Sequence, residues 1–195
     1  MRKRSNRVAL TILGATAFTL AGCQHEKVEA EAFPDLQSCE AAASAGAGGP
    51  DAADCAAAFA EAQKLHVESA PRYDSLQLCE EQHGAGACGS EADAVGNQSG
   101  GSGSIFMPLL AGYLIGNMLG RGGVGAQPLY KTSNGRFANA TGSQVYGSNR
   151  GRATLGANHF ARPPSTLGKA PMTRASVASR GGFGKTVGSR GGFGG

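Results

Sequence analysis

IFMPLLAGYLIGNML, residues 105–119, is the one strongly apolar stretch of the chain beyond its N-terminus. Gly112, Gly116 and Gly120 recur every four residues, a spacing that on a helix lines one face and lets a second helix approach closely. Pro108 fits the first turn of such a helix. We therefore expect residues 105–120 to form a short glycine-zipper helix. It would pack against the protein's own helices, or it would insert into a membrane or join a homo-oligomer.

The N-terminus has the features of a bacterial lipoprotein signal. Four basic residues fall within the first seven positions, an uncharged apolar run follows from Val8 to Ala21, and Leu20–Cys23 reads LAGC. The apolar run is too short to span a membrane comfortably and suits a signal-peptide core. We expect cleavage after residue 22 and attachment of diacylglyceryl and a further acyl chain, such as palmitate, at Cys23. Gln24 in place of an aspartate favours the outer membrane, with the protein lipid-anchored and facing the periplasm.

Charge divides the chain into an acidic and a basic half. All 14 acidic residues lie between Glu26 and Asp93, whereas 11 of the 18 basic residues lie between Arg121 and Arg190. Such asymmetry suggests contact between the two halves, or contact of the basic half with an anionic surface. A solvated tail is the plainer alternative.

Glycine is concentrated toward the C-terminus, since 25 of the 32 glycines lie between Gly89 and Gly195, and the chain has no tryptophan. A segment so poor in large apolar side chains buries little surface to offset the conformational entropy that glycine loses on folding. We expect a mostly α-helical protein, with a disulfide-stapled acidic unit over residues 23–93 and a Gly/Ser linker over 94–104. The basic, Gly-rich tail over 121–195 is expected to be largely irregular or disordered, with short strands near 129–131 and 144–146.

Local signals predict three helices in the acidic unit. Asp35 is a plausible N-cap for a helix reaching residue 45, and the alanine-rich stretch over 51–70 has apolar positions at helical spacing. Pro71 ends that helix, and a third is expected over 75–82.

Four cysteines remain after Cys23: Cys39, Cys55, Cys79 and Cys88. Residues 33–40 (FPDLQSCE) and 73–80 (YDSLQLCE) form an internal repeat, and a second cysteine follows each copy. One bridge per copy, Cys39–Cys55 and Cys79–Cys88, is the simplest pairing for an exported protein. A zinc site at Cys79, His83 and Cys88 and a redox-active pair are weaker alternatives, because the chain has no C-x-x-C.

The C-terminus carries the hexapeptide SRGGFG twice, at residues 179–184 and 189–194. We expect Arg180, Phe183, Arg190 and Phe193 to contact an anionic lipid, lipopolysaccharide or an envelope protein. RGG segments also bind RNA, but an exported lipoprotein rarely meets nucleic acid, so no nucleic-acid partner is expected.

Further short motifs follow one another along the chain: Ala70–Tyr73 leading into Cys79-Glu80 with Gly84 and Cys88, Phe106–Leu109 with Ala111–Tyr113, Gln127–Leu129 and Arg180–Gly184. Together with the lipobox at Cys23 and the four spaced cysteines, their order resembles the YgiB-like family of uncharacterised bacterial lipoproteins. The chain departs from the family pattern at His83, where an aromatic residue is expected, and its second RGGFG copy looks like an addition. The resemblance implies an envelope lipoprotein of undefined biochemical role, with no reaction and no catalytic residue.

No catalytic pattern is recognisable in the sequence, since G-x-S-x-G, H-E-x-x-H and phosphate-binding loops do not occur. We therefore expect a non-enzymatic structural or binding module without cofactor or metal. The alternative is a membrane-active oligomer assembled through the face of Gly112, Gly116 and Gly120.

Overall fold

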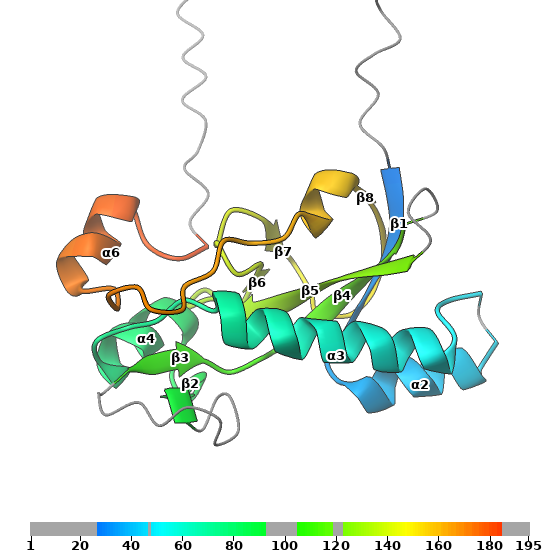
Figure 1. The fold of residues 1–195 in the computed structure, drawn as a ribbon, viewed down its shortest axis with the longest axis horizontal. Coiled ribbons are helices and arrows are strands. Elements are labelled where there is room, and N and C mark those ends of the chain that lie inside the picture. Colours follow the sequence, from blue (N-terminus) through cyan, green and yellow to red (C-terminus); the bar gives the residue numbers. More distant parts are fainter. Residues whose placement is uncertain (1–26, 47, 93–104, 119–122, 185–195) are drawn as a thin grey trace, which may run out of the picture.

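A six-stranded antiparallel sheet, not a helical unit, forms the centre of the molecule (Figure 1). The computed structural model describes residues 27–46, 48–92, 105–118 and 123–184. The strand order is β7-β6-β5-β4-β1-β8. The strands are β1 (Lys27–Phe33), β4 (Gly112–Met118), β5 (Gly123–Lys131), β6 (Phe137–Ala138), β7 (Val145–Tyr146) and β8 (Gly151–Gly156).

The expectation of a mostly helical fold is therefore wrong. In β1 the buried residues Val28, Ala30 and Ala32 alternate with charged ones, which is the period-2 pattern of a strand with one buried face. This strand pairs with β4 on one side and β8 on the other, so the acidic and basic halves share one sheet.

The glycine-rich apolar stretch forms strands instead of the expected helix. Residues 106–108 form β3 (Phe106–Pro108), and residues 112–118 form β4 near the centre of the sheet. Tyr113 and Ile115 face one core cluster and Leu114 faces the other, so both faces of β4 are covered. A strand buried on both faces has a continuous apolar sequence, which periodicity does not distinguish from a buried helix.

The glycines of this stretch allow close packing at the sheet. A Cβ on Gly116 would lie 2.3 Å from Cζ of Phe160, so Gly116 makes room for that ring. Gly112 has a φ of +145°, and a Cβ there would lie 2.7 Å from the Phe33 carbonyl oxygen. Gly120 lies outside the described residues. No helix within the described ranges is long and apolar enough to cross a membrane.

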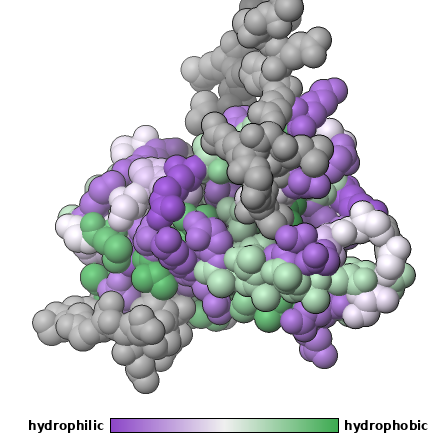
Figure 2. Space-filling view, turned by 45° about the vertical axis from the view of Figure 1, so that its right-hand side comes forward, coloured by the Kyte–Doolittle hydropathy of each residue, from purple (hydrophilic) through white to green (hydrophobic). Residues whose placement is uncertain are grey.

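The three predicted helices are confirmed as α2 (Leu36–Ser44), α3 (Ala52–Ser69) and α4 (Leu76–His83). Each has a side-chain N-cap, from Asp35, Asp51 and Ser75 respectively, which satisfies backbone amides of the first turn. Helices α2 and α3 cover one face of the sheet. The outer face of α3, where Ala52, Ala53, Ala56, Ala57 and Ala60 are exposed, forms a weakly hydrophobic band (Figure 2).

Two disulfides crosslink the helical half of the molecule, which contains α2, α3 and α4, and their pairing is the one that the internal repeat predicts. Cys39–Cys55 joins α2 to α3. Cys79–Cys88 joins α4 to β2 (Cys88–Ser90), which pairs with β3. Because Cys79 and Cys88 are bonded to each other, their sulfurs are not free thiolates for a metal.

The Gly-rich half is folded through residue 184, contrary to the expectation of a largely irregular tail. It supplies β5 to β8, and then η2 (Ala157–Phe160) and α6 (Arg174–Arg180). Strand β5 contains the predicted strand over 129–131 but is longer, and β7 lies within the one predicted over 144–146. Phe160 of η2 packs against the face of the sheet opposite α3. The chain then returns to the helical half, where the Met172 amide donates to the Arg72 carbonyl at 2.7 Å.

Candidate functional site

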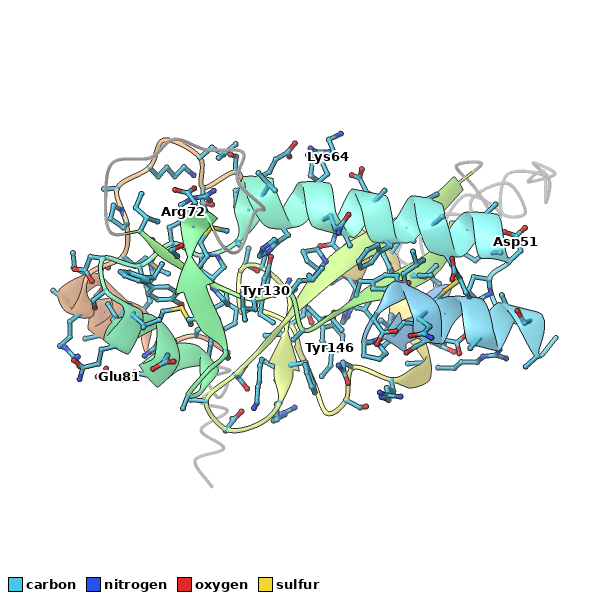
Figure 3. The ribbon with its side chains drawn as sticks, turned by 90° about the horizontal axis from the view of Figure 1, so that it is seen from below. Asp51, Lys64, Arg72, Glu81, Tyr130 and Tyr146 are labelled. Atoms are coloured by element: carbon cyan, nitrogen blue, oxygen red, sulfur yellow. A yellow bond between two sulfur atoms is a disulfide. The ribbon has the colours of Figure 1, made fainter. Side chains whose placement is uncertain are left out.

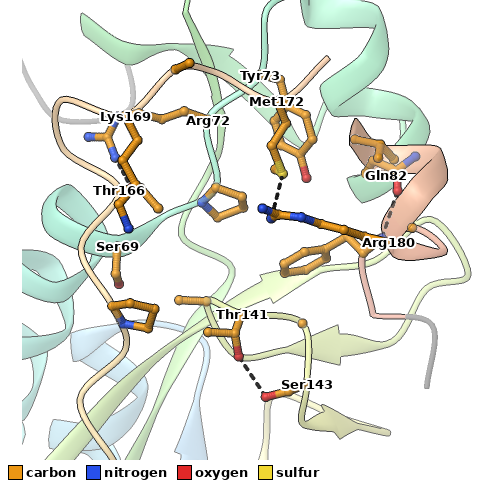
Figure 4. A pocket seen from close by; sticks show the side chains of 18 residues that line it. Ser69, Arg72, Tyr73, Gln82, Thr141, Ser143, Thr166, Lys169, Met172 and Arg180 are labelled. Atoms are coloured by element: carbon orange, nitrogen blue, oxygen red, sulfur yellow. Dashed lines mark hydrogen bonds between the residues drawn. The ribbon is translucent and has the colours of Figure 1, made fainter. Parts of the chain in front are cut away.

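A pocket of about 410 Å³ lies where the returning C-terminal segment meets the helical half (Figure 4). Four separate stretches of chain form most of its wall. They are the connection after α3 (Ser69 and Pro71–Tyr73), the turn between β6 and β7 (Ala140–Ser143), the segment before α6 (Pro164, Thr166, Lys169, Ala170 and Met172), and α6 with the residues after it (Val177, Arg180, Gly182 and Phe183).

The lining of the pocket is cationic, because it contains Arg72, Lys169 and Arg180 and no acidic residue. Arg72 lies just beyond the end of α3 (Figure 3), and only 5% of its surface is exposed. Its Nε donates to Glu91 at 2.9 Å, and its terminal nitrogens donate to the Val67 carbonyl and the Thr166 hydroxyl. Arg72 therefore holds the pocket wall together and has little capacity left for a ligand.

Lys169 and Arg180 differ from Arg72 in being exposed and without an acidic partner among the described residues. Arg180 extends across the pocket from α6, and its Nη1 lies 3.6 Å from the Met172 sulfur (Figure 4). The hydroxyls of Thr141 and Ser143, 2.7 Å apart, lie on the opposite wall. Lys169 and Arg180 thus supply two cations that suit a bound anion, whereas the hydroxyl hydrogens of Thr141 and Ser143 are used in hydrogen bonds within the turn.

Behind the pocket, Tyr73 and His83 form a buried hydrogen-bonded pair. The His83 Nδ1 lies 2.7 Å from the Lys131 carbonyl, which only accepts, so Nδ1 carries the proton. Nε2 then accepts from the Tyr73 hydroxyl at 2.8 Å. Burial lowers the pKa of His83 to about 4 and raises the pKa of Tyr73, so both groups are neutral near pH 7.

Phe183, at the end of the first SRGGFG copy, docks onto this pair. Its ring centroid lies 4.3 Å from that of His83, and its amide donates to Gln82 Oε1 at 2.8 Å. Upstream in α6, Val177 is buried against Tyr73 and Leu78. Part of the first SRGGFG copy, which we expected to contact a partner, thus packs inside the protein.

The structure brings two of the predicted partner-binding residues together at the pocket, Arg180 and Phe183. Arg190, Phe193 and the lipidation residue Cys23 lie outside the described residues. Lys169 and Thr141 were missed by sequence reasoning, because no local pattern marks a basic or hydroxyl side chain in a loop as part of a site. The repeated SRGGFG was the one usable signal for this region.

Comparison with known proteins identifies relatives of unknown function. Residues 27–194 match a family described as "Protein of unknown function (DUF1190)". A UPF0441 protein of Pectobacterium carotovorum is 33% identical over 198 residues, covering 94% of this chain and 83% of the relative. A UPF0441 protein of Erwinia tasmaniensis is 35% identical over 195 residues, covering 92% and 80%. No solved structure matches the chain.

Proposed function

This chain belongs to the DUF1190 family of proteins of unknown function, and we propose that it is a lipid-anchored envelope protein that binds an anionic lipid head group in its pocket. The family membership confirms the resemblance to the YgiB-like proteins. The observation that carries the proposed function is the pocket lining, which has three cations, of which two are unpaired within the described residues, and no acid.

The anchor follows from the LAGC sequence ending at Cys23. The first described strand, β1, begins at Lys27, four residues later. An extended chain spans at most about 3.6 Å per residue, so a lipid on Cys23 would hold Lys27 within about 14 Å of its attachment point. The folded body would then sit at the membrane surface, where a lipid head group is within reach. Two disulfides also fit export to an oxidising compartment, and Gln24 favours the outer membrane.

The pocket suits a phosphate-bearing head group with an apolar remainder. Lys169 and Arg180 offer charge-assisted hydrogen bonds to a phosphate group. Pro71 and Met172 add apolar wall for carbon atoms of the ligand. The Tyr73–His83 pair is neutral and His83 has no exposed surface, so we propose binding without catalysis.

Binding is tested with the full mature chain carrying Cys23→Ala, so that the protein's own lipid does not contribute. Sedimentation compares vesicles containing an anionic phospholipid with vesicles of phosphatidylcholine alone. Lys169→Ala and Arg180→Ala should each weaken binding to the anionic vesicles about tenfold, the size of one charged hydrogen bond. Competition by glycerol phosphate separates recognition of the phosphate group from recognition of the bilayer.

Arg136→Ala is the matched control for that experiment. Arg136 is exposed, has no acidic partner within the described ranges and does not line the pocket. If Arg136→Ala weakens binding as much as Arg180→Ala, general electrostatic attraction accounts for the binding and the pocket does not.

The anchor is tested separately in cells by labelling with radioactive palmitate and membrane fractionation. The wild-type protein should be labelled and should sediment with outer membranes. Cys23→Ser should lose both properties. A labelled Cys23→Ser protein would contradict the anchor and would leave the vesicle experiment unaffected.

A further inference from the structure

The sequence repeat at the C-terminus has a period of ten residues and extends beyond the SRGGFG hexapeptide. Residues 176–184 read SVASRGGFG and residues 186–194 read TVGSRGGFG. Seven of these nine positions are identical, and the other two change serine to threonine and alanine to glycine. The first copy is docked on the helical half, so its contacts show which residues the docking site requires.

The site, defined here as the Phe183 site, is formed by Tyr73, Leu78, Gln82, His83 and Thr132. It buries a valine, since Val177 is only 8% exposed, and it holds a phenylalanine ring 4.3 Å from that of His83. The amide at Phe183 donates to Gln82, a contact that any residue at that position makes. Valine and phenylalanine six positions apart are therefore the two side-chain anchors.

The backbone between and after the anchors requires glycine. Gly181, Gly182 and Gly184 have φ values of +79°, +89° and +65°, in the left-handed region that other residues rarely adopt. A Cβ on Gly184 would also lie 2.5 Å from Thr132 Cγ2. The second copy meets all of these requirements, with Val187, Gly191, Gly192, Phe193 and Gly194 at the matching positions.

We propose that the second copy is an alternative occupant of the Phe183 site in the same chain, reached by a shift of ten residues. Val187 and Phe193 then replace Val177 and Phe183. Covalent connection gives the second copy a high effective concentration at the site, and a longer connecting loop adds little closure entropy. In this register Arg190 corresponds in sequence to Arg180.

Contacts outside the repeat favour the first copy. Thr173 caps α6 by accepting from the Ser176 amide, and Arg174 donates to Glu81 at 2.7 and 2.8 Å. In the shifted register Phe183 and Gly184 stand at the positions of Thr173 and Arg174, so both contacts are lost. The shifted state is thus the minor one in the wild-type chain, and removal of an anchor from the first copy promotes it.

Photo-crosslinking tests the shift in the full mature chain with Cys23→Ala. With p-benzoylphenylalanine at position 193, the Phe183→Ala chain should crosslink within itself to peptides of the Phe183 site. The yield should be several-fold higher than in the chain that keeps Phe183. Adding Gly192→Val should abolish the crosslink, because valine disfavours the required positive φ, whereas Lys185→Val should leave it unchanged.

Thermal unfolding gives a second readout without the crosslinker. As a single change, Phe193→Ala should leave the Tm of the protein unchanged. The same change should lower the Tm of the Phe183→Ala protein. Three results would overturn the proposal: additive Tm changes with no crosslink, crosslinks that join two chains, or a Phe183→Ala chain that does not fold. The last would show that the second copy is unable to substitute. None of these outcomes depends on the ligand of the pocket, so the proposed function stands or fails separately.

Discussion

Among single residues, His83 is the most constrained titratable group near the pocket. It has no exposed surface and both of its ring nitrogens are hydrogen-bonded, to the Lys131 carbonyl and the Tyr73 hydroxyl. Its ring also supports Phe183. Protonation of Nε2 would reverse its hydrogen bond with the Tyr73 hydroxyl and place a charge in an apolar surrounding, so the docked C-terminal segment depends on a neutral His83.

Acid should therefore destabilise the protein through His83. The pKa of His83 is about 4 in the folded chain and 6.5 when exposed, so between these values the unfolded chain binds more protons. The free energy of unfolding should be level above pH 6.5 and should fall by roughly 3 kcal/mol as the pH drops to 4. Urea unfolding at several pH values measures this slope. His83→Gln should show a shallower slope, and equal slopes in the two proteins would refute the assignment.

At the scale of elements, β4 shows why the glycine spacing predicted the wrong secondary structure. Residues four apart share a helical face, but they also share a strand face, because side chains alternate along a strand. Gly112 and Gly116 lie on the β4 face that carries Leu114, where Gly116 is covered by Phe160 of η2. Because Gly116 has no side chain, the 3₁₀ helix η2 packs closely on the sheet. A glycine zipper would instead require a second long helix on that face.

Substitution of Gly116 tests this packing. Gly116→Ala should cost about 1–3 kcal/mol of stability, because the new methyl group overlaps the Phe160 ring and the surrounding core has to shift. In a Phe160→Ala background the same change should cost much less, and urea unfolding of the four proteins gives the coupling energy. Gly147→Ala is the control, since a Cβ there has no atom within 4 Å. Additive effects of the two changes would contradict the contact.

At the scale of the whole molecule, the acidic and basic halves are interleaved parts of one fold. Strand β1 from the acidic half lies between β4 and β8. Three arginines of the basic half reach acids of the other half, as Arg152–Glu31, Arg162–Glu68 and Arg174–Glu81. These pairs are partly exposed and contribute little each, so the sheet and the four core clusters of the described residues join the halves.

The acidic half should consequently not fold by itself. A fragment of residues 24–104 with both disulfides retains α2, α3 and α4 but loses β4 and β8, the partners of β1, and β5, on which α3 packs. It should show no cooperative thermal transition by circular dichroism, whereas residues 24–195 should unfold in one step. Well-dispersed amide resonances from the fragment would contradict this expectation.

The sequence by itself determined the features whose causes lie within a few residues. Asp35, Asp51 and Ser75 cap their helices through amides three positions away, and the repeat around Cys39 and Cys79 indicates which cysteines pair. Family membership also followed from short motifs in a shared order.

Only the tertiary structure decided the sheet and the pocket. Residues 105–119 suit a buried helix or a buried strand equally in composition, and the strand is selected because β1 and β5 pair with both edges of β4. The pocket collects side chains from three distant parts of the chain: Tyr73 after α3, Thr141 between β6 and β7, and Lys169 and Arg180 from the segment that leads into α6. Hydrogen bonding between strands and burial of two faces depend on partners far along the chain, and those partners are set only when the whole chain folds.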